Sequence, residues 1–328
     1  MTFKSVCVVG LGYIGLPTAA IASLSGYEVL GLDVNKDVVD SLNCGKIHIV
    51  EPGLQEVVQQ SVSNGSLKAI SVAEPADVFV IAVPTPFKGS EHTPDLSFIQ
   101  SVASMISPVL NKGNLVILES TSPVGTTENL RGWLFKNRPD LNFSVDKDSE
   151  PDVFIAYCPE RVLPGNTLKE LRENDRVIGG LCEKSSDLAV SFYSQFVTGK
   201  CYRTNAKTAE MSKLVENSYR DVNIAFANEL ATLSKELDIN VWELINLANR
   251  HPRVNILYPG AGVGGHCIAV DPWFIISQNP EKSALMKQAR LINDHKPQTI
   301  IHEVMNLFSM KKGDLLDNKN KIGLFGLS

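Results

Sequence analysis

Residues 6–17 of this chain read VCVVGLGYIGLP. The apolar residues before Gly10 favour a strand and the residues from Gly15 onward favour a helix, so the glycines between them form a turn. Gly10 permits a tight turn, Gly12 lets the backbone approach a pyrophosphate, and Gly15 lets the helix pack closely on the strand. Because the free N–H groups and the dipole of a helix N-terminus favour negative charge, this pattern predicts dinucleotide binding.

An aspartate stands at the position where a dinucleotide-binding turn needs an acid. Asp33 ends the second predicted strand and follows Gly15 by 18 residues. A carboxylate there can accept hydrogen bonds from both hydroxyls of an adenosine ribose, and it repels a 2′-phosphate. The sequence therefore predicts NAD rather than NADP as cofactor, with a plain turn or capping role for Asp33 as the alternative.

Short apolar runs alternate with helix-like segments through about the first 200 residues, the length of one domain. The predicted strands cover residues 4–9, 28–33, 77–83, 114–119 and 152–156, and the predicted helices cover 13–25, 36–43, 98–110 and 127–135. This alternation predicts an α/β fold with a Rossmann-like, doubly wound parallel sheet.

Two polar segments follow strands of this predicted sheet. Thr85 comes after the strand at 77–83, and ESTSPVGTT occupies residues 119–127. Ligands meet doubly wound sheets at the carboxyl ends of the strands, which makes both segments candidates for ligand contact. Since Ser, Thr, Pro and Gly also dominate ordinary turns, turn chemistry remains the alternative.

The pattern changes near residue 205. Apolar residues then recur at spacings of three and four, which predicts one long helix over 209–237: Met211, Leu214, Val215, Val222, Ala225, Phe226, Leu230, Leu233 and Leu237. Further helices are predicted over 241–249 and 281–309, so this part is mostly α-helical.

We divide the chain accordingly into three parts. Residues 1–204 form the expected cofactor domain, and residues 205–310 form a helical central domain. Residues 311–321 are polar and read as a linker. The sequence IGLFGLS at 322–328 resembles a new buried strand with a glycine turn, so we expect the first strand of a truncated third domain there.

The long predicted helix carries a polar stripe. At 100° per residue, Lys213, Asn217 and Arg220 fall within about 60° of one another, and the apolar residues centre on the opposite face. A solvated helix face is one explanation. The other is a catalytic face, with a lysine that handles an oxygen, a neutral amide and an arginine that binds phosphate.

A glycine-rich segment precedes a cysteine. Residues 259–274 read PGAGVGGHCIAVDPWF, in which Cys267 follows the glycines and Asp271 comes four residues later. Glycines let the backbone approach a ligand closely. A free cysteine is most often a small buried hydrophobe, but beside an exposed glycine loop it can be a thiolate nucleophile.

Composition excludes several classes of protein. The chain has 328 residues, 44% of them apolar, and a formal net charge of −5. A mildly acidic chain argues against bulk binding of nucleic acid, and no apolar run reaches the ~18–20 residues of a membrane helix. Six cysteines without a CxxC pair and six histidines without metal-ligand spacing favour reduced thiols, a cytoplasmic location and no metal site.

Taken together, these motifs resemble the nucleotide-sugar 6-dehydrogenases, the UDP-glucose and UDP-N-acetylmannosamine dehydrogenase family. The resemblance runs from residue 4 to the end of the chain. Further motifs that support it are PTP at 84–86, YCPERVLPG at 157–165 and the Lys213-x-x-x-Asn217 helix. GGHCIAVDP and HPRVN at 251–255 resemble the UDP-N-acetylmannosamine branch, whereas the glucose branch typically has a GGSCFPKD-like segment.

The resemblance implies an NAD domain, a helical middle domain that also forms a homodimer, and a UDP-binding third domain. It implies a four-electron oxidation of the C6 alcohol of a UDP-sugar to a carboxylate through a thiohemiacetal and a thioester on Cys267. The implied product is UDP-N-acetyl-D-mannosaminuronate, a donor for surface polysaccharide.

Site residues follow from the same resemblance, position by position. Those that match catalytic groups are Cys267, Lys213, Asn217, Asp271, Glu160 and Thr121. Those that match NAD contacts are Gly10, Gly12, Tyr13, Ile14, Gly15, Asp33, Thr85 and Thr126. Those that match substrate contacts are Arg161, Val162, Lys213, Asn217, Arg220, His251, Arg253 and Gly264.

Three alternatives stay open. The sugar can be glucose, N-acetylglucosamine or N-acetylgalactosamine, since the same catalytic groups serve all these substrates. A two-electron β-hydroxyacid dehydrogenase shares the cofactor domain and a Lys-x-x-x-Asn helix, but it needs no cysteine. A shortened chain can also bind NAD and dimerise without turnover.

Overall fold

The computed structural model describes residues 3–89, 92–145, 150–265 and 267–307. The chain forms two compact units, of which the first ends at Glu216 and the second begins at Asn217. The boundary falls inside one continuous helix, and each unit is described by itself below. The linker and strand expected over 311–328 lie outside the described residues.

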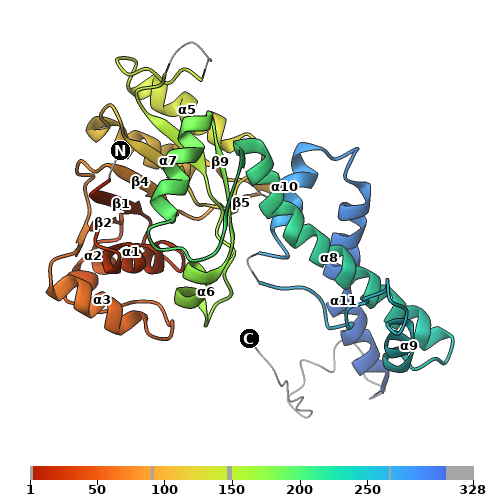
Figure 1. The fold of residues 1–328 in the computed structure, drawn as a ribbon. Helices are drawn as coiled ribbons and strands as arrows, with labels where there is room; N and C mark the ends of the chain where they lie inside the picture. Colours follow the sequence, from red (N-terminus) through yellow and green to blue (C-terminus); the bar gives the residue numbers. More distant parts are fainter. Residues whose placement is uncertain (1–2, 90–91, 146–149, 266, 308–328) are drawn as a thin grey trace. The chain divides into compact units, whose positions relative to one another are not determined.

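The first unit is built on an eight-stranded sheet whose order is β10-β9-β8-β7-β4-β1-β2-β3 (Figure 1). The strands are β1 (Ser5–Val9), β2 (Glu28–Leu32), β3 (Leu67–Ile70), β4 (Val78–Ile81), β7 (Leu115–Leu118), β8 (Phe154–Tyr157), β9 (Arg176–Gly180) and β10 (Cys201–Asn205). Between β4 and β7, a short hairpin pairs β5 (Phe87–Lys88) with β6 (Thr93–Pro94).

The sheet order confirms the predicted fold. From β3 to β8 the order is that of a dinucleotide-binding sheet, and all these neighbours pair in parallel. In β1, for example, Val6 lies opposite Val29 of β2 and Val78 of β4. Beyond β8 the sheet continues through β9, which is antiparallel to β8, and β10, which is parallel to β9.

Helices cover both faces of the sheet because its strands are apolar on both sides. Val6 and Val8 of β1 belong to one core, and Cys7 and Val9 belong to the other. The first core also takes side chains from α1 (Gly15–Leu24), α2 (Lys36–Asn43), α3 (Leu54–Ser63), α6 (Thr167–Glu173) and α7 (Glu183–Tyr193). The second takes them from α4 (Ser97–Ile106), which continues into a 3-10 turn η1 (Ser107–Val109), and from α5 (Thr126–Asn137).

The second unit is helical as predicted. The long helix α8 (Ala206–Glu236) runs into it from the first unit, and α9 (Val241–Ala248), α10 (Asp271–Gln278) and α11 (Ala284–Leu307) follow. Asn240 caps α9, because its side chain accepts hydrogen bonds from the N–H groups of Trp242 and Glu243. Helix α11 contains Pro297 in its interior.

The apolar pattern that predicted α8 does not mark a buried face throughout. In the second unit Phe226 is 51% exposed and Leu237 is 67% exposed, whereas Asp221 and Asn228 are buried. The buried side of α8 is polar because it meets polar partners on α11, among them Arg290 and Asn293. In this part of the helix, the apolar periodicity therefore predicts the helix but does not identify its buried face.

Candidate active site

The glycine turn has the geometry that its sequence predicts. Gly10 adopts a positive φ of 89°, and a Cβ on it would lie 2.9 Å from the carbonyl oxygen of Ala82. A Cβ on Gly15 would lie 1.8 Å from the carbonyl oxygen of Gly10, so helix and turn are in direct contact. A Cβ on Gly12 would meet nothing within 4 Å in the described structure. The space beside Gly12 therefore fits a group from outside the chain, such as a pyrophosphate.

The N-terminus of α1 fits the same ligand. Ile14 is the N-cap residue of α1 and provides no side-chain hydrogen bond to it. Within α1 the N–H of Leu16 donates to the carbonyl oxygen of Gly12 at 3.1 Å, and Pro17 has no N–H. The donors for an anion at this turn therefore come from residues before Leu16. Tyr13, the other residue of this turn with a predicted NAD contact, is 58% exposed.

Asp33 lies immediately after β2 and braces the glycine turn. Its Oδ2 accepts the N–H of Leu11 at 2.9 Å, and its Oδ1 accepts the N–H of Asn35 at 2.9 Å. Each carboxylate oxygen retains a second lone pair. Asp33 can therefore hold the turn and still accept hydrogen bonds from ribose hydroxyls.

The loops after β4 and β7 are joined by hydrogen bonds. The Oγ1 of Thr85 donates to the carbonyl oxygen of Thr121 at 2.6 Å, and the Oγ of Ser120 donates to that of Val83 at 2.6 Å. The buried Thr126 donates its hydroxyl to the carbonyl oxygen of Pro123 at 2.7 Å. The structure thus brings Thr85 and Thr121 together, and their roles toward NAD and water stay predictions.

Helix α8 is fastened to this loop by Glu210, a residue that sequence analysis missed. The Glu210 carboxylate accepts hydrogen bonds from the N–H of Gly125 at 2.6 Å and from the N–H and Oγ1 of Thr127 at 2.8 and 2.6 Å. Burial raises the pKa of Glu210, and these hydrogen bonds oppose that rise. The sequence offered one indication of Glu210, because it is an acid three residues before Lys213 and on the same side of the helix.

Lys213 is 9% exposed, which is unusual for a lysine. Among the described residues of the first unit, none forms an ion pair with it. A buried ammonium without a carboxylate partner is costly unless another ligand supplies the partner. This burial favours the catalytic explanation of the polar stripe over a solvated one.

Glu160, in the loop after β8, is held at both oxygens. Its Oε2 lies 2.7 Å from Nη1 of Arg176, and its Oε1 accepts the N–H of Arg161 at 2.7 Å. The guanidinium of Arg161 forms an ion pair with Glu216 at 2.8 Å, and Val162 beside it is half-buried. The predicted base is thus buried and fixed in orientation.

Arg176, which sequence analysis did not single out, also contacts a second buried acid, Glu119, the first residue of the candidate segment ESTSPVGTT. Glu119 lies 3.5 Å from Nη1 of Arg176, accepts the Tyr193 hydroxyl at 2.8 Å and accepts the Oγ1 of Thr18 on α1 at 3.3 Å. Burial raises the pKa of Glu119 to about 7, although Arg176 opposes this rise. The available signal was a charged residue at the end of the apolar run NLVILE.

In the second unit, the structure joins two of the predicted catalytic residues. The Asn217 amide donates from Nδ2 to Oδ2 of Asp271 at 2.6 Å. Asp271 begins α10 and is 3% exposed, and its N–H donates to the carbonyl oxygen of Cys267 at 2.9 Å. Cys267 itself is exposed, so it is not a core cysteine. An exposed thiol is accessible to a substrate, as the reactive explanation requires.

The remaining predicted substrate contacts in this unit lie on its surface. Arg220, His251, Arg253 and Gly264 are all exposed. The N–H of Arg253 donates to Nδ1 of His251 at 3.3 Å, which closes a small turn. These residues are accessible to a ligand, and their role toward the substrate stays a prediction.

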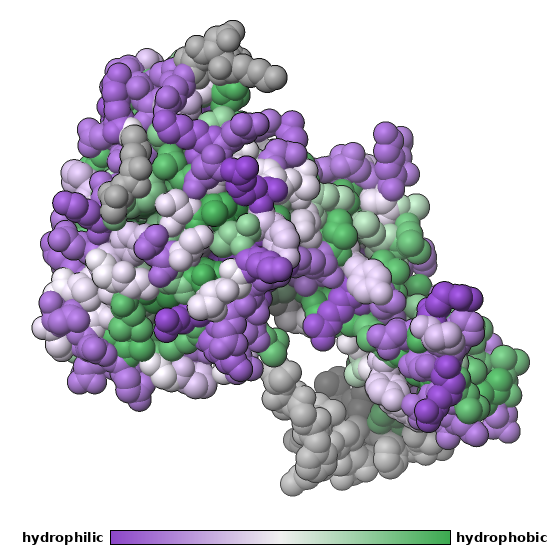
Figure 2. Space-filling model, viewed as in Figure 1, coloured by the Kyte–Doolittle hydropathy of each residue, from purple (hydrophilic) through white to green (hydrophobic). Residues whose placement is uncertain are grey.

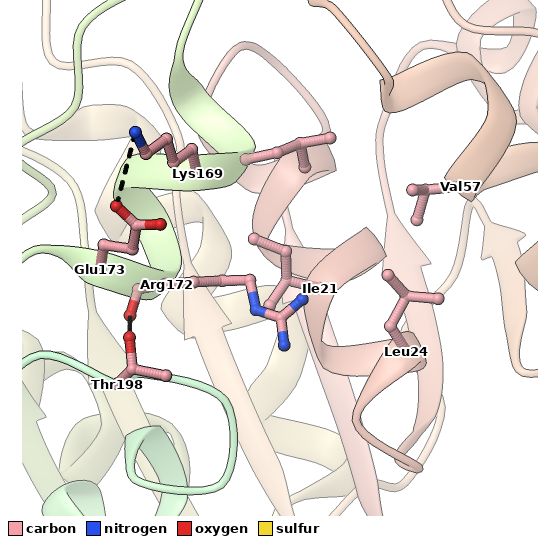
Figure 3. A pocket seen from close by; sticks show the side chains of 8 residues that line it. Ile21, Leu24, Val57, Lys169, Arg172, Glu173 and Thr198 are labelled. Carbon is pink, nitrogen blue, oxygen red and sulfur yellow. Dashed lines mark hydrogen bonds and ion pairs between the residues drawn. The ribbon is translucent and has the colours of Figure 1, made fainter.

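A pocket of about 440 Å³ in the first unit lies elsewhere (Figure 3). It is lined by Ile21 and Leu24 at the far end of α1 from the glycine turn, by Val57 of α3, and by residues of α6. Ligands of doubly wound sheets bind at the carboxyl ends of the strands, not here. None of the predicted site residues lines this pocket.

Two further searches cover the described residues only. No group of three or more His, Cys, Asp and Glu side chains there could hold a metal ion. In the same part of the chain, no helix combines the length and the apolar character that crossing a membrane requires.

Comparison with protein-family models gives two adjacent matches. The NAD-binding domain of the UDP-glucose/GDP-mannose dehydrogenase family matches residues 4–197, and its central domain matches residues 207–295. The two matches together cover most of the chain. They agree with the cofactor domain and the helical part described above.

Individual proteins agree with these models. The chain is 59% identical to a UDP-N-acetyl-D-mannosamine dehydrogenase from Campylobacter jejuni, over 92% of this chain and 74% of that protein. It is 57% identical to an NDP-N-acetyl-D-galactosaminuronic acid dehydrogenase from Ralstonia nicotianae, over 92% of this chain and 71% of that protein. A solved UDP-D-ManNAc dehydrogenase from Pyrococcus horikoshii is 42% identical with a TM-score of 0.86, covering 94% of this chain and 73% of that one. The chain therefore belongs to the UDP-glucose/GDP-mannose dehydrogenase family and is an NAD-dependent oxidoreductase.

Proposed function

We propose that this protein oxidises C6 of UDP-N-acetyl-D-mannosamine to the carboxylate, in a four-electron reaction that uses Cys267. The observation that carries the proposal is the anchored segment of Cys267, in which buried Asp271 accepts the Asn217 amide at 2.6 Å. The name of the relative from Campylobacter jejuni supports this sugar, and the name of the relative from Ralstonia nicotianae makes the galactosamine epimer the nearest competitor.

The cofactor site is formed by the glycine turn and Asp33. Backbone N–H groups of the glycine turn, up to Gly15 at the start of α1, would hold the pyrophosphate, and Asp33 would accept the ribose hydroxyls. Tyr13, Thr85 and Thr126 would contact other parts of NAD. When bound, NAD accepts one hydride from C6 in each of two oxidations.

The first oxidation turns the C6 alcohol into an aldehyde. As C6 loses its hydride, the hydroxyl loses its proton, and the buried Lys213 would stabilise the oxygen while negative charge develops on it. The Cys267 sulfur would then add to the aldehyde carbon, and the aldehyde oxygen would take up a proton. The resulting thiohemiacetal keeps a reactive aldehyde from escaping.

The second oxidation removes a hydride and a proton from the thiohemiacetal and leaves a thioester on Cys267. Water would attack its carbonyl carbon while Glu160 takes a proton from the water. Asn217 and Asp271 would hold the water and the oxyanion, and Thr121 would lie near the water. Cleavage of the C–S bond returns the thiol and releases the carboxylate.

Substrate recognition rests on charge and loop geometry. Arg220 and Arg253 are exposed guanidinium groups, which suit a diphosphate. We assign His251, Gly264, Arg161 and Val162 to contacts with the rest of the UDP-sugar. The product would serve as a uronic-acid donor for surface polysaccharide.

The protein would act as a homodimer through its helical unit. The apolar face of α8 includes Tyr219, Phe226 and Leu233, and Leu237 follows directly after the helix; all four are 48–70% exposed. Trp242 and Leu247 extend this surface onto α9, where Figure 2 shows apolar side chains at the surface. Exposed apolar surface of this kind marks interfaces between proteins.

The experiment that tests this function counts NADH formed per UDP-N-acetyl-D-mannosamine consumed. We expect a ratio of about two for the unchanged chain, since each oxidation releases one hydride. Cys267→Ala would stop formation of the acid. The matched control is Cys44→Ala, which removes another exposed cysteine.

Three results would contradict the proposal. A ratio of about one that does not change in Cys267→Ala would indicate a two-electron dehydrogenase. NAD binding without turnover of any UDP-sugar would indicate a non-catalytic dimer. A higher kcat/KM for UDP-N-acetylgalactosamine, UDP-N-acetylglucosamine or UDP-glucose would correct the sugar and leave the chemistry in place.

A further inference from the structure

The segment that carries Cys267 is tied to α8 at both of its ends. At one end Asn217 donates to Asp271, and at the other end the N–H of Gly260 donates to Oδ1 of Asn228 at 2.9 Å. Asn217 and Asn228 are three helical turns apart, so they lie on the same face of α8, roughly 16 Å from each other. Asn228 is only 1% exposed.

The orientation of the Asn228 amide is set by the buried carboxylate of Asp221, to which Asn228 is linked through Asn293. Asp221 can only accept hydrogen bonds, so Asn293 points Nδ2 at its Oδ1, at 2.8 Å. This leaves Oδ1 of Asn293 to accept Nδ2 of Asn228 at 2.9 Å. The Asn228 oxygen must then face the other way, where Gly260 donates to it.

The charge at the start of this chain of bonds is itself held in place. Nη1 of Arg290 donates to Oδ1 of Asp221 at 2.6 Å, and both side chains are 1% exposed. Because one acceptor fixes two successive amides, the network has a single direction, from the Asp221 carboxylate to the Gly260 N–H.

Helix α11 supports the glycine loop at a second point. Gly262 has a positive φ of 131°, and a Cβ on it would lie 3.0 Å from the ring of Pro297. The Nζ of Lys296, next in the helix, donates to the carbonyl oxygen of Asn228 at 3.3 Å. The loop is thus packed against α11 and hydrogen-bonded to α8.

We propose that Asn228 is a positioning residue for the Cys267 segment, with its amide oriented by Asp221 through Asn293. A segment that begins PGAGVGG has little conformational preference of its own and needs external contacts to hold one geometry. The inference rests on the proposed function, in which Cys267 is the nucleophile. Loss of the Asn228 contact lowers kcat more than it raises KM, because the thiol is displaced while the exposed substrate contacts remain.

The test compares two substitutions of Asn228 that both remove its donor to Asn293, of which only one also removes its acceptor for Gly260. Asn228→Ala and Asn228→Asp both remove the Nδ2 donor to Asn293, so both lower the melting temperature. Only the alanine also removes the acceptor for Gly260. We expect amide hydrogen exchange in the peptide that contains Gly260 to rise roughly tenfold in Asn228→Ala and to stay near the unchanged rate in Asn228→Asp.

Thr232→Ala is the matched control. The Thr232 hydroxyl donates to the carbonyl oxygen of Asn228 at 3.2 Å, one turn along α8, rather than to the Cys267 segment. We expect no change there in loop exchange, in the rate at which iodoacetamide alkylates Cys267, or in kcat. The alkylation rate, followed by mass spectrometry of the Cys267 peptide, is expected to change severalfold in Asn228→Ala only.

Exchange and alkylation do not depend on turnover, so the two proposals can fail separately. Equal loop exchange in the alanine and aspartate variants, whether fast or slow, would overturn the positioning role. If Cys267→Ala keeps full conversion to the acid while the loop still loosens only in Asn228→Ala, the proposed function fails and the anchoring stands.

Discussion

The two units bury opposite kinds of side chain. In the first unit, both faces of the sheet are packed with valine, leucine, isoleucine and phenylalanine, and buried charges lie near the carboxyl ends of the strands. In the second unit, α8 meets α11 through Asp221, Asn228, Arg290 and Asn293, and turns a row of large apolar side chains outward.

This difference shows that an apolar periodicity indicates a helix without indicating which face is covered by the same chain. In the first unit, helices of the same chain cover both faces of the sheet, so the apolar side chains of the strands are buried. In the second unit, polar groups of α8 and α11 hydrogen-bond to one another inside, although Oδ2 of Asp221 and Nε of Arg290 are buried without a hydrogen-bond partner among the described residues. In the proposed dimer, a second molecule would cover the apolar face. Buried polar networks of this kind favour one arrangement over others more than they add stability.

The largest effect is expected from breaking the ion pair inside the second unit. Arg290→Met leaves Asp221 buried without its cation, which lowers the free energy of unfolding of that unit by about 3–5 kcal/mol. Lys235→Met is the control, because Lys235 also links α8 to α11, through Glu303 at 3.1 Å, but on the exposed surface. We expect about 0–1 kcal/mol there, and equal losses by chemical denaturation would contradict the contrast.

The first unit buries the carboxyl group of Glu119, and its effect can be measured as a dependence of stability on pH. The pKa of Glu119 is about 7 in the folded protein against an ordinary 4.5, so folding takes up a proton between these values. The stabilising contribution is complete below about pH 4.5 and is lost as pH rises through 7, a change of about 3 kcal/mol. Glu119→Gln is expected to flatten this dependence.

Denaturation curves at intervals from pH 4.5 to 8 measure the effect. The control is Glu28→Gln, which changes an exposed acid in the same unit. If the unchanged chain and the Glu119 variant lose stability in parallel over this range, Glu119 is ionised throughout and the pKa shift is wrong.

The outward apolar face can be tested by substitution at its centre. Phe226→Ser removes a large exposed side chain of α8 and is expected to weaken dimerisation by about 2 kcal/mol or more, with little change in the stability of the monomer. Sedimentation at several concentrations measures the dissociation constant. Phe135→Ser, which changes an equally exposed phenylalanine in the first unit, is the control. If the unchanged chain is a monomer, the proposed dimer through the helical unit is wrong.

The smallest expected effect compares one helix cap in each unit. Asn35 accepts the N–H of Asp37 at the start of α2, and Asn240 accepts those of Trp242 and Glu243 at the start of α9. Alanine at either position is expected to cost about 1 kcal/mol. If the units unfold separately, each substitution lowers only its own transition in a calorimetric scan, and a shared shift would show that they unfold together.

Most of the fold could be predicted because its signals are local. Five strands, the glycine turn and the long helix each follow from a run of neighbouring residues. Strand β3 was missed because Lys68 interrupts its short apolar run LKAI, and β9 was missed because RVIGG ends in two glycines. Its antiparallel pairing with β8 depends on the route of the chain between them, which no local pattern specifies.

The site could be predicted less completely, for a similar reason. Glycines, Asp33 and the Lys213-x-x-x-Asn217 pair lie within recognisable motifs. The residues that support them bond over long distances in sequence: Glu119 to Tyr193 across 74 residues, and Glu210 to Thr127 across 83. Such partners become visible only once the sheet and helices bring them together.

The bracing of the glycine turn by Asp33 has a consequence for redesign of the cofactor preference. A common aim would be to replace this acid with a small or basic residue so that a 2′-phosphate can enter. Here the same carboxylate also accepts the N–H groups of Leu11 and Asn35. Any such exchange would therefore release two backbone donors beside the turn, so selectivity for the cofactor and rigidity of its cradle cannot be altered independently at this position.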